Sequence, residues 1–171
     1  MLRLILAFVE IALHRRSPAD LPASRAFFGA VLVIYVGFEL ATTRYFGLVK
    51  YPELLVAFDT VLELAFIWAM LRAFEHERRF RQAAVAVLGV DTLLNLATVP
   101  VLVWQRSLHV AKGELTIPNI VVLIVQIWSI DVSAFILARA LERPYFLTIA
   151  LMLGYFLLSL SVDATFFATP E

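Results

Sequence analysis

Long apolar stretches, separated by short polar ones, dominate the chain from residue 25 onward. Each stretch is close to the ~20 residues that a helix needs, at ~1.5 Å per residue, to cross the hydrocarbon core of a bilayer. A membrane barrel would instead show alternating segments of ~10 residues. The pattern predicts five transmembrane helices, at about residues 26–44, 53–72, 82–105, 118–138 and 145–168.

Prolines agree with these boundaries. Pro52, Pro118 and Pro144 each stand at or just before the start of a predicted span, where a missing N–H costs a helix little. The predicted fold class is therefore all-α, a polytopic bundle of five transmembrane helices preceded by an amphipathic helix.

The N-terminal segment carries that amphipathic pattern. Its apolar run is too short to cross a bilayer core of ~30 Å. Arg3, Glu10 and His14 fall on one helical face, at spacings of seven and four. The opposite face consists of Leu2, Ile5, Leu6, Val9 and Leu13. Positive charge is concentrated after the apolar run, at Arg15 and Arg16, instead of before it, which disfavours a signal peptide. We predict an interfacial helix and turn over residues 1–22, then a transmembrane domain over residues 23–171.

Composition supports a membrane protein. Hydrophobic residues make up 62% of the chain and charged residues 16%, against roughly 45–50% and 25% in soluble domains. The formal net charge is zero and there is no cysteine, so disulfides and thiolate metal sites are excluded. We expect the lipid bilayer as the surroundings of the chain and no nucleic-acid partner.

Basic residues predict the orientation. With a cytoplasmic N-terminus, ten lie in inside segments: Arg3, Arg15, Arg16, Arg25, Arg72, Arg78, Arg79, Arg81, Arg139 and Arg143. Four lie in outside loops: Arg44, Lys50, Arg106 and Lys112. The reverse topology violates the positive-inside rule. We therefore predict a multi-pass protein of the cell inner membrane, with the N-terminus cytoplasmic and the C-terminus periplasmic.

Acidic residues inside the spans are the main lead to function. Six lie away from the span ends: Glu39, Asp59, Glu63, Asp91, Asp131 and Asp163. The interiors of the spans hold no Lys, Arg or His. An ionised carboxylate at mid-helix costs roughly 2.5–3.5 kcal/mol, and such residues usually face a bundle interior or a water-filled cavity. We expect all six to turn inward.

Neighbouring polar residues point the same way, since side chains four positions apart share a helix face. Such groups occur on four spans, as Tyr35–Glu39–Thr43, Asp59–Glu63, Asp91–Asn95 and Ser159–Asp163. On the fourth predicted span, Gln126 and Ser129 lie off the face of Asp131. The seven candidate site residues are thus the six acids and Asn95. They form either a path for protons or cations, or polar contacts between helices.

The acids fall at two depths in this topology. The outer part of the membrane holds Glu39, Asp59 and Asp163. The middle or inner part holds Glu63, Asp91 and Asp131. Desolvation and like-charge repulsion disfavour six ionised acids in a dry bundle. Protonation, a bound cation, or an arginine reaching in from a loop, such as Arg44, are the alternatives.

Other chemistry has less support. Glu10 and His14 supply two metal ligands at helical spacing, but two ligands are not a site, and a surface ion pair accounts for them, so metal binding is left open. The sequence holds no nucleophile elbow, phosphate loop, zinc-protease motif or dinucleotide fingerprint. We expect no catalytic residue and no cofactor.

The layout resembles the small five-span inner-membrane proteins of the Yip1-like group, over residues 25–168. Gly154-Tyr155 within a span is similar to a Gly-Tyr pair of that family. The resemblance implies a non-enzymatic membrane scaffold or assembly factor, and it assigns no functional residue.

Two functions fit the sequence. The first is an inner-membrane scaffold or accessory subunit without enzymatic activity, whose acids pair within a homo-oligomer or with a membrane partner subunit. The second is a proton- or cation-coupled transporter or channel, with Glu63, Asp91 and Asp131 as the core of its path.

Overall fold

A computed structural model describes residues 2–47, 49–108 and 115–167. Within them the chain forms six α-helices and two short 3₁₀ segments, with no strand, which confirms the predicted all-α class. Residue 1, Lys112 and residues 168–171, which the predictions include, lie outside the described part, as does the side chain of Leu2.

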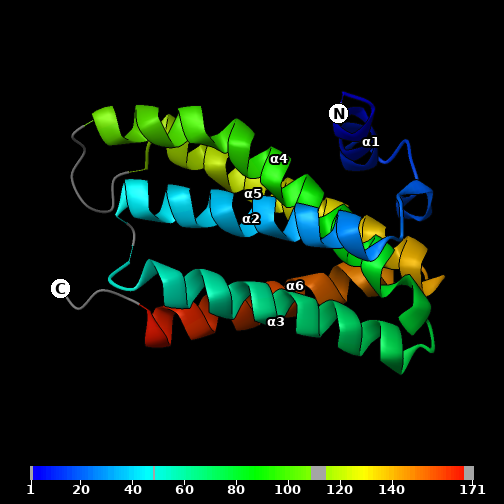
Figure 1. The fold of residues 1–171 in the computed structure, drawn as a ribbon. Coiled ribbons are helices and arrows are strands. Elements are labelled where there is room, and N and C mark those ends of the chain that lie inside the picture. Colours follow the sequence, from blue (N-terminus) through cyan, green and yellow to red (C-terminus); the bar gives the residue numbers. More distant parts are fainter. Residues whose placement is uncertain (1, 48, 109–114, 168–171) are drawn as a thin grey trace.

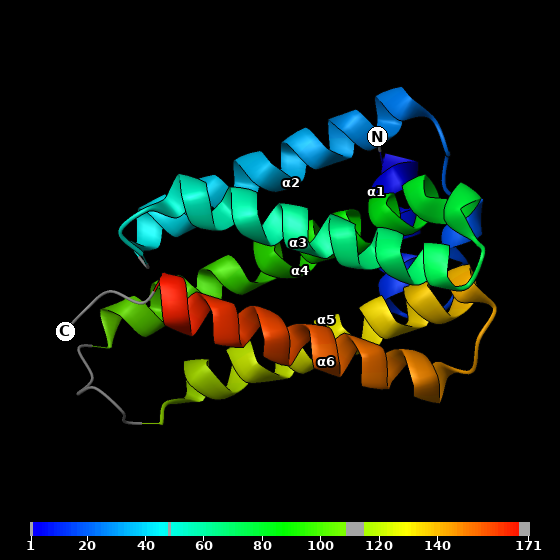
Figure 2. The ribbon, with the colours of Figure 1, turned by 90° about the horizontal axis from the view of Figure 1, so that it is seen from below.

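Five long helices make up the bundle (Figure 1). They are α2 (Arg25–Phe46), α3 (Pro52–Ala73), α4 (Phe80–Ser107), α5 (Ile117–Leu141) and α6 (Tyr145–Phe166). All five are long and apolar enough to cross a membrane, as predicted. The connections alternate between two ends of the bundle, and Figure 2 shows the helices lying alongside one another. We call the end that carries α1 the α1 end, and the opposite one the far end.

Local signals account for the helix boundaries. Ser24 caps α2 by accepting a hydrogen bond from the Phe27 amide at 3.1 Å, the usual role of serine at that position. Gly47 ends α2 with a left-handed φ of 62°, which glycine adopts without steric cost. Pro52 begins α3 and Pro118 lies in the first turn of α5.

Close packing concentrates in the half of the bundle toward the α1 end. On α4 every residue from Ala83 to Val90 is buried, and on α5 so is every residue from Val132 to Leu137. Small side chains such as Ala84, Ala86 and Ala134 let the two helices approach closely. The far half has few buried residues and leaves room for a cavity.

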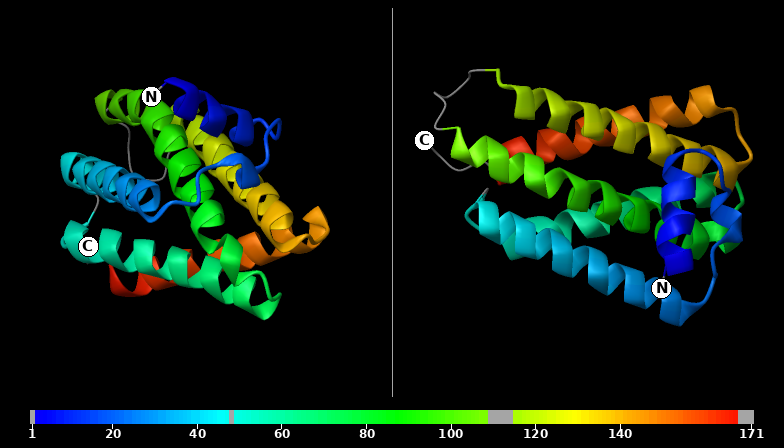
Figure 3. Two further views of the ribbon diagram at one scale, coloured as in Figure 1. Left: turned by 45° about the vertical axis from the view of Figure 1, so that its right-hand side comes forward. Right: turned by 90° about the horizontal axis from the view of Figure 1, so that it is seen from above.

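The N-terminal helix α1 (Leu2–Ala12) lies across α4 and α5 (Figure 3). It buries Ala7, Phe8, Ile11 and Ala12 against the bundle. Gly89 of α4 lies so close to the Phe8 ring that a Cβ there would collide with it. The apolar face identified in the sequence points away from the bundle and is exposed, at Ile5, Leu6, Val9 and Leu13.

Candidate functional site

A cavity of about 410 Å³ lies between the five long helices, from mid-bundle toward the far end. Five of the six predicted acids line it, together with Asn95: Glu39, Asp59, Glu63, Asp91 and Asp163. Tyr35 of α2 and Tyr155 of α6 add hydroxyl groups. The structure thus brings six of the seven candidate residues together, from α2, α3, α4 and α6.

The inner part of the cavity is built around Glu63 and Asp91. Glu63 of α3 approaches Asp91 of α4 and Tyr35 of α2 within hydrogen-bonding reach. Ser129 of α5 donates a hydrogen bond of 2.7 Å to Asp91 Oδ1. Only 7% of Glu63 is exposed, and its Oε2 atom has no hydrogen-bond partner among the described residues. A buried carboxylate oxygen without a donor is costly, so this atom marks a place for a proton or a cation.

Asp59 and Asp163 form a second pair, nearer the far end. Their carboxyl groups, from α3 and α6, lie within hydrogen-bonding reach of each other. When ionised, both groups can accept hydrogen bonds but cannot donate them. In the described part of the chain, the Oδ1 atom of each is buried without a donor. The contact is therefore favourable only when a proton or a cation is shared between them.

Glu39 is held differently. Its Oε1 atom accepts a hydrogen bond of 2.5 Å from Asn95 Nδ2, which joins α2 to α4. The side chain of Glu39 is half-buried and Asn95 is exposed. This pair lies at a more open part of the cavity than Glu63.

The described residues place no compensating positive charge in the cavity. None of its lining residues in the described ranges is Lys, Arg or His. Arg44, which the sequence offered as a partner for the outer acids, instead pairs with Glu53, with 3.0 Å between Arg44 Nε and Glu53 Oε1. Of the alternatives that the sequence left open, compensation of the acids by Arg44 is therefore not the one found, because Glu53 at the far end engages this arginine.

Apolar packing closes the cavity toward the α1 end. The Phe66 and Tyr155 rings stack with centroids 4.8 Å apart, and Ile67, Val87 and Met152 are buried beside them. The space below Glu63 is a void of about 10 Å³, which holds at most about one water molecule. The cavity is blind at this end.

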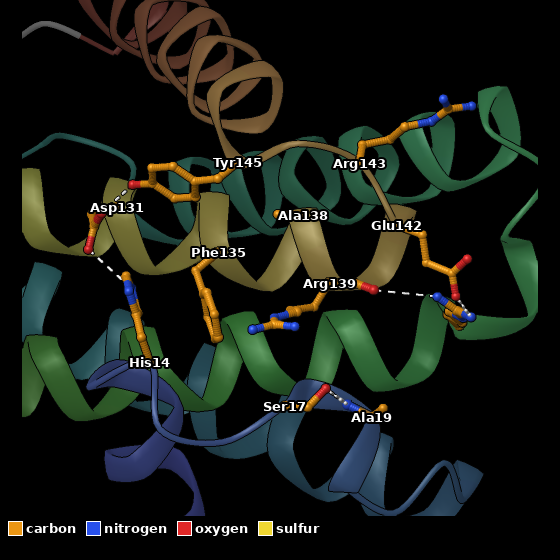
Figure 4. A pocket seen from close by; sticks show the side chains of 11 residues that line it. His14, Ser17, Ala19, Asp131, Phe135, Ala138, Arg139, Glu142, Arg143 and Tyr145 are labelled. Carbon is orange, nitrogen blue, oxygen red and sulfur yellow. Dashed lines mark hydrogen bonds and ion pairs between the residues drawn. The ribbon is translucent and has the colours of Figure 1, made fainter.

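Asp131 is the candidate residue that lies elsewhere (Figure 4). It lines a separate cleft at the α1 end, where its Oδ2 atom lies 3.1 Å from His14 Nε2 and its Oδ1 atom accepts a hydrogen bond from the Tyr145 hydroxyl. Two residues along a helix correspond to a turn of ~200°, so Ser129 and Asp131 face opposite sides of α5. The predicted grouping of Asp131 with Glu63 and Asp91 is wrong for this reason.

The six acids differ in how far they are buried. Glu63 is buried, whereas the other five acids are half-buried. The cause is the open cavity on one face of α5 and the open cleft on the other. An acid can face the inside of the bundle and still be partly exposed, because it faces a cavity or a cleft that is open to water.

Sequence reasoning missed the polar face that α5 turns to the cavity. Gln126, Ser129 and Ser133 line it at spacings of three and four, which is a helical stripe. Asp131, with which Gln126 and Ser129 do not share a face, lies on the other side of α5. The spacing itself was a usable signal. Tyr155 had the same signal, because it precedes Ser159 and Asp163 on α6 by four and eight positions, and all three line the cavity.

The chemistry available in the cavity is cation or proton uptake. Two like charges ~4 Å apart repel by roughly 4 kcal/mol at an effective dielectric constant of ~20, so each facing pair favours one proton or a cation. Within the described residues no three His, Asp or Glu side chains form a group that could hold a metal ion.

No protein-family model, no curated protein and no solved structure matches the chain.

Proposed function

We propose that this chain is a multi-pass inner-membrane protein without enzymatic activity that takes up protons or a small cation in its cavity, as a coupled carrier does. The observation that carries the proposal is the set of facing acids, Glu63 with Asp91 and Asp59 with Asp163, in a cavity whose described lining has no basic side chain. Acids within membrane spans commonly mark proton or ion pathways.

The blind end favours a carrier over an open channel. A channel needs a continuous polar path, whereas the Phe66–Tyr155 stack and its apolar neighbours separate this cavity from the α1 end. A carrier that alternates its access has one closed side in each state. Movement of α3 and α6, which carry these two rings, would open the path.

The orientation belongs to the same proposal. The ten arginines of the predicted inside segments lie on elements at the α1 end, and the positive-inside rule supports a cytoplasmic α1 end. The C-terminus and the open side of the cavity would then face the periplasm.

A scaffold or accessory subunit is the second candidate. The same missing counter-charge favours it, because a basic side chain of a membrane partner, or of a second copy of the chain, can supply that charge. Exposed Asn95, hydrogen-bonded to Glu39, lies where such a side chain could enter. The resemblance to Yip1-like proteins agrees with this role.

Flux through liposomes tests the carrier. We expect the wild-type protein to dissipate an imposed proton or sodium gradient, and Asp91→Asn and Glu63→Gln to abolish this activity. Asp131→Asn is the matched control, since it removes the same kind of charge from α5 outside the cavity. Melting temperature and gel filtration verify that each variant is folded.

The outcomes separate the two candidates. A wild-type protein that dissipates neither gradient contradicts the carrier. The scaffold predicts a stoichiometric partner or a defined homo-oligomer after extraction in mild detergent, and a stable, partner-free monomer contradicts it.

A further inference from the structure

The cleft at the α1 end plays no part in the proposed function. It has a volume of about 810 Å³, and residues of η1 (Pro18–Asp20), η2 (Glu77–Arg79), α5, α6 and the segment between α1 and η1 surround it. This size is within the range of roughly 300–1,000 Å³ that small-molecule sites have. Its described lining includes the arginines Arg79, Arg139 and Arg143 and the carboxylates Asp131 and Glu142.

Both carboxylates are already engaged. Asp131 contacts His14 and accepts a hydrogen bond from the Tyr145 hydroxyl. Glu142 accepts a hydrogen bond from Arg79, and this contact lowers the pKa of that carboxyl. Arg79 also donates to the Ala140 carbonyl at 3.1 Å. Neither acid is left to neutralise another arginine.

Arg139 is paired with neither of these two acids. Its guanidinium carbon lies 5.4 Å from the centroid of the Phe135 ring, and no carboxylate of the described residues is within ion-pairing distance of it. Figure 4 shows Arg139 extending into the cleft toward His14, whereas Arg143 points away. A planar guanidinium beside an aromatic ring and open to a cleft is a ready donor to phosphate.

The surroundings of the cleft place it at the level of lipid headgroups. Helix α1 lies beside it with Ile5, Leu6 and Val9 exposed, and an apolar helix face of this kind enters the boundary between headgroups and acyl chains. Trp128 joins α1 to α5 by donating a hydrogen bond of 3.1 Å to the Ala12 carbonyl. Tyr145, the first residue of α6, lines the cleft, and tyrosine is enriched at the level of the headgroups.

We propose that this cleft binds the phosphate of an anionic phospholipid headgroup through the Arg139 guanidinium. The Arg139 guanidinium, which no carboxylate of the described residues pairs with, selects an anionic headgroup over a zwitterionic one. The adjoining apolar face of α1 receives the acyl chains, which a free phosphate lacks. This site is independent of what the carboxylate cavity carries.

Native mass spectrometry of the full chain in neutral detergent tests the site. Phosphatidylglycerol, phosphatidylcholine and inorganic phosphate are titrated separately, and retention is measured. We expect phosphatidylglycerol to be retained about tenfold better by wild-type protein than by Arg139→Gln, with partial retention in Arg139→Lys. Arg78→Gln removes the same charge from the same end outside the cleft, and we expect it to change retention by less than about twofold.

Three results overturn the proposal. They are unchanged retention of phosphatidylglycerol in Arg139→Gln, equal retention of phosphatidylglycerol and phosphatidylcholine by wild-type protein, and binding of inorganic phosphate as tight as that of the lipid. The comparison between lipids needs no variant, so it decides the question even where Arg139→Gln does not fold.

Discussion

Ser129 and Asp131 lie two positions apart on α5 and serve different sites. Ser129 donates a hydrogen bond to Asp91 across the carboxylate cavity at 2.7 Å, whereas Asp131 contacts His14 of the N-terminal segment at 3.1 Å. Helix α5 therefore forms a wall between two sites of different chemistry. One site collects acids without a counter-charge, and the other ties the N-terminal segment to the bundle.

Asp131 is expected to hold α1 in place. Asp131→Asn weakens the contact with His14, and a hydrogen bond of this kind contributes about 0.5–1.5 kcal/mol. The undocked fraction should rise several-fold, and limited trypsin digestion after Arg15 and Arg16 should accelerate by the same factor, because cleavage follows the open population. Ser129→Ala is the control on the other face of α5 and should leave the cleavage rate unchanged. Equal rates in the two variants would contradict the tether.

Water is expected to reach the side of α6 that lines the carboxylate cavity, but not the side of α6 that faces lipid. The chain contains no cysteine, so single cysteines can be introduced without background. Ser159→Cys lines the cavity on α6, and Leu157→Cys, two positions away, is exposed on another face of the helix. A membrane-impermeant thiol reagent should label only the first in proteoliposomes, because thiols react as thiolates in water.

The side of labelling tests the orientation. With a cytoplasmic α1 end, Ser159→Cys in intact cells should react with reagent supplied from the periplasm. Arg78→Cys, at the α1 end, should react only after the membrane is made permeable. The reverse pattern contradicts the proposed topology, and equal labelling of Ser159→Cys and Leu157→Cys contradicts the cavity.

The sequence was sufficient for the helices and for most of the site. Apolar length predicts spans because unpaired backbone groups are excluded from lipid, and all five long helices agree. The cost of ionised groups in hydrocarbon predicts inward acids, and Glu39, Asp59, Glu63, Asp91 and Asp163 do share one cavity. Both results follow from properties that a single helix carries by itself.

Pairings between helices could not be predicted. Arg44 had several carboxylates within reach in the sequence topology, and only the packing of α2 and α3 selects Glu53. The contact of His14 with Asp131 spans most of the chain and depends on how α1 crosses α5. Rotation about a helix axis is set by packing against neighbours, which a single sequence does not encode in its periodicity.

Gly89 is expected to be essential for docking of α1. A side chain at Gly89 meets the Phe8 ring, and overpacking of this kind costs about 1–3 kcal/mol. Gly89→Leu should therefore undock α1 and accelerate trypsin cleavage after Arg15 and Arg16. Phe8→Ala frees the space, so adding it to Gly89→Leu should restore part of the protection. Gly154→Leu is the control, because nothing lies near a Cβ at that position. The absence of any rescue by Phe8→Ala would show that Gly89 acts otherwise.

The ion pair of Glu142 with Arg79 is expected to make stability depend on pH. The hydrogen bond from Arg79 lowers the pKa of Glu142 in the folded protein. Its contribution to stability is therefore complete above the pKa of the unfolded state and is lost as the pH falls through the lower, folded-state pKa. Glu142→Gln should reduce the melting temperature at neutral pH, and the difference from wild type should vanish once the pH is below the folded-state pKa of Glu142.

The substitution isolates the charge of Glu142. Glutamine keeps the length of the side chain, so the left-handed backbone at φ 54° is as strained as before. Glu75→Gln is the matched control, since Glu75 is also exposed, lies at the α1 end and has a φ of 63°. We expect no difference in melting temperature between Glu75→Gln and wild type at either pH, because Glu75 forms no ion pair with another described residue, unlike Glu77 and Glu142. A deficit in Glu142→Gln that persists at acid pH would mean that the amide disturbs packing at the end of α5, and that the charge on Glu142 contributes little.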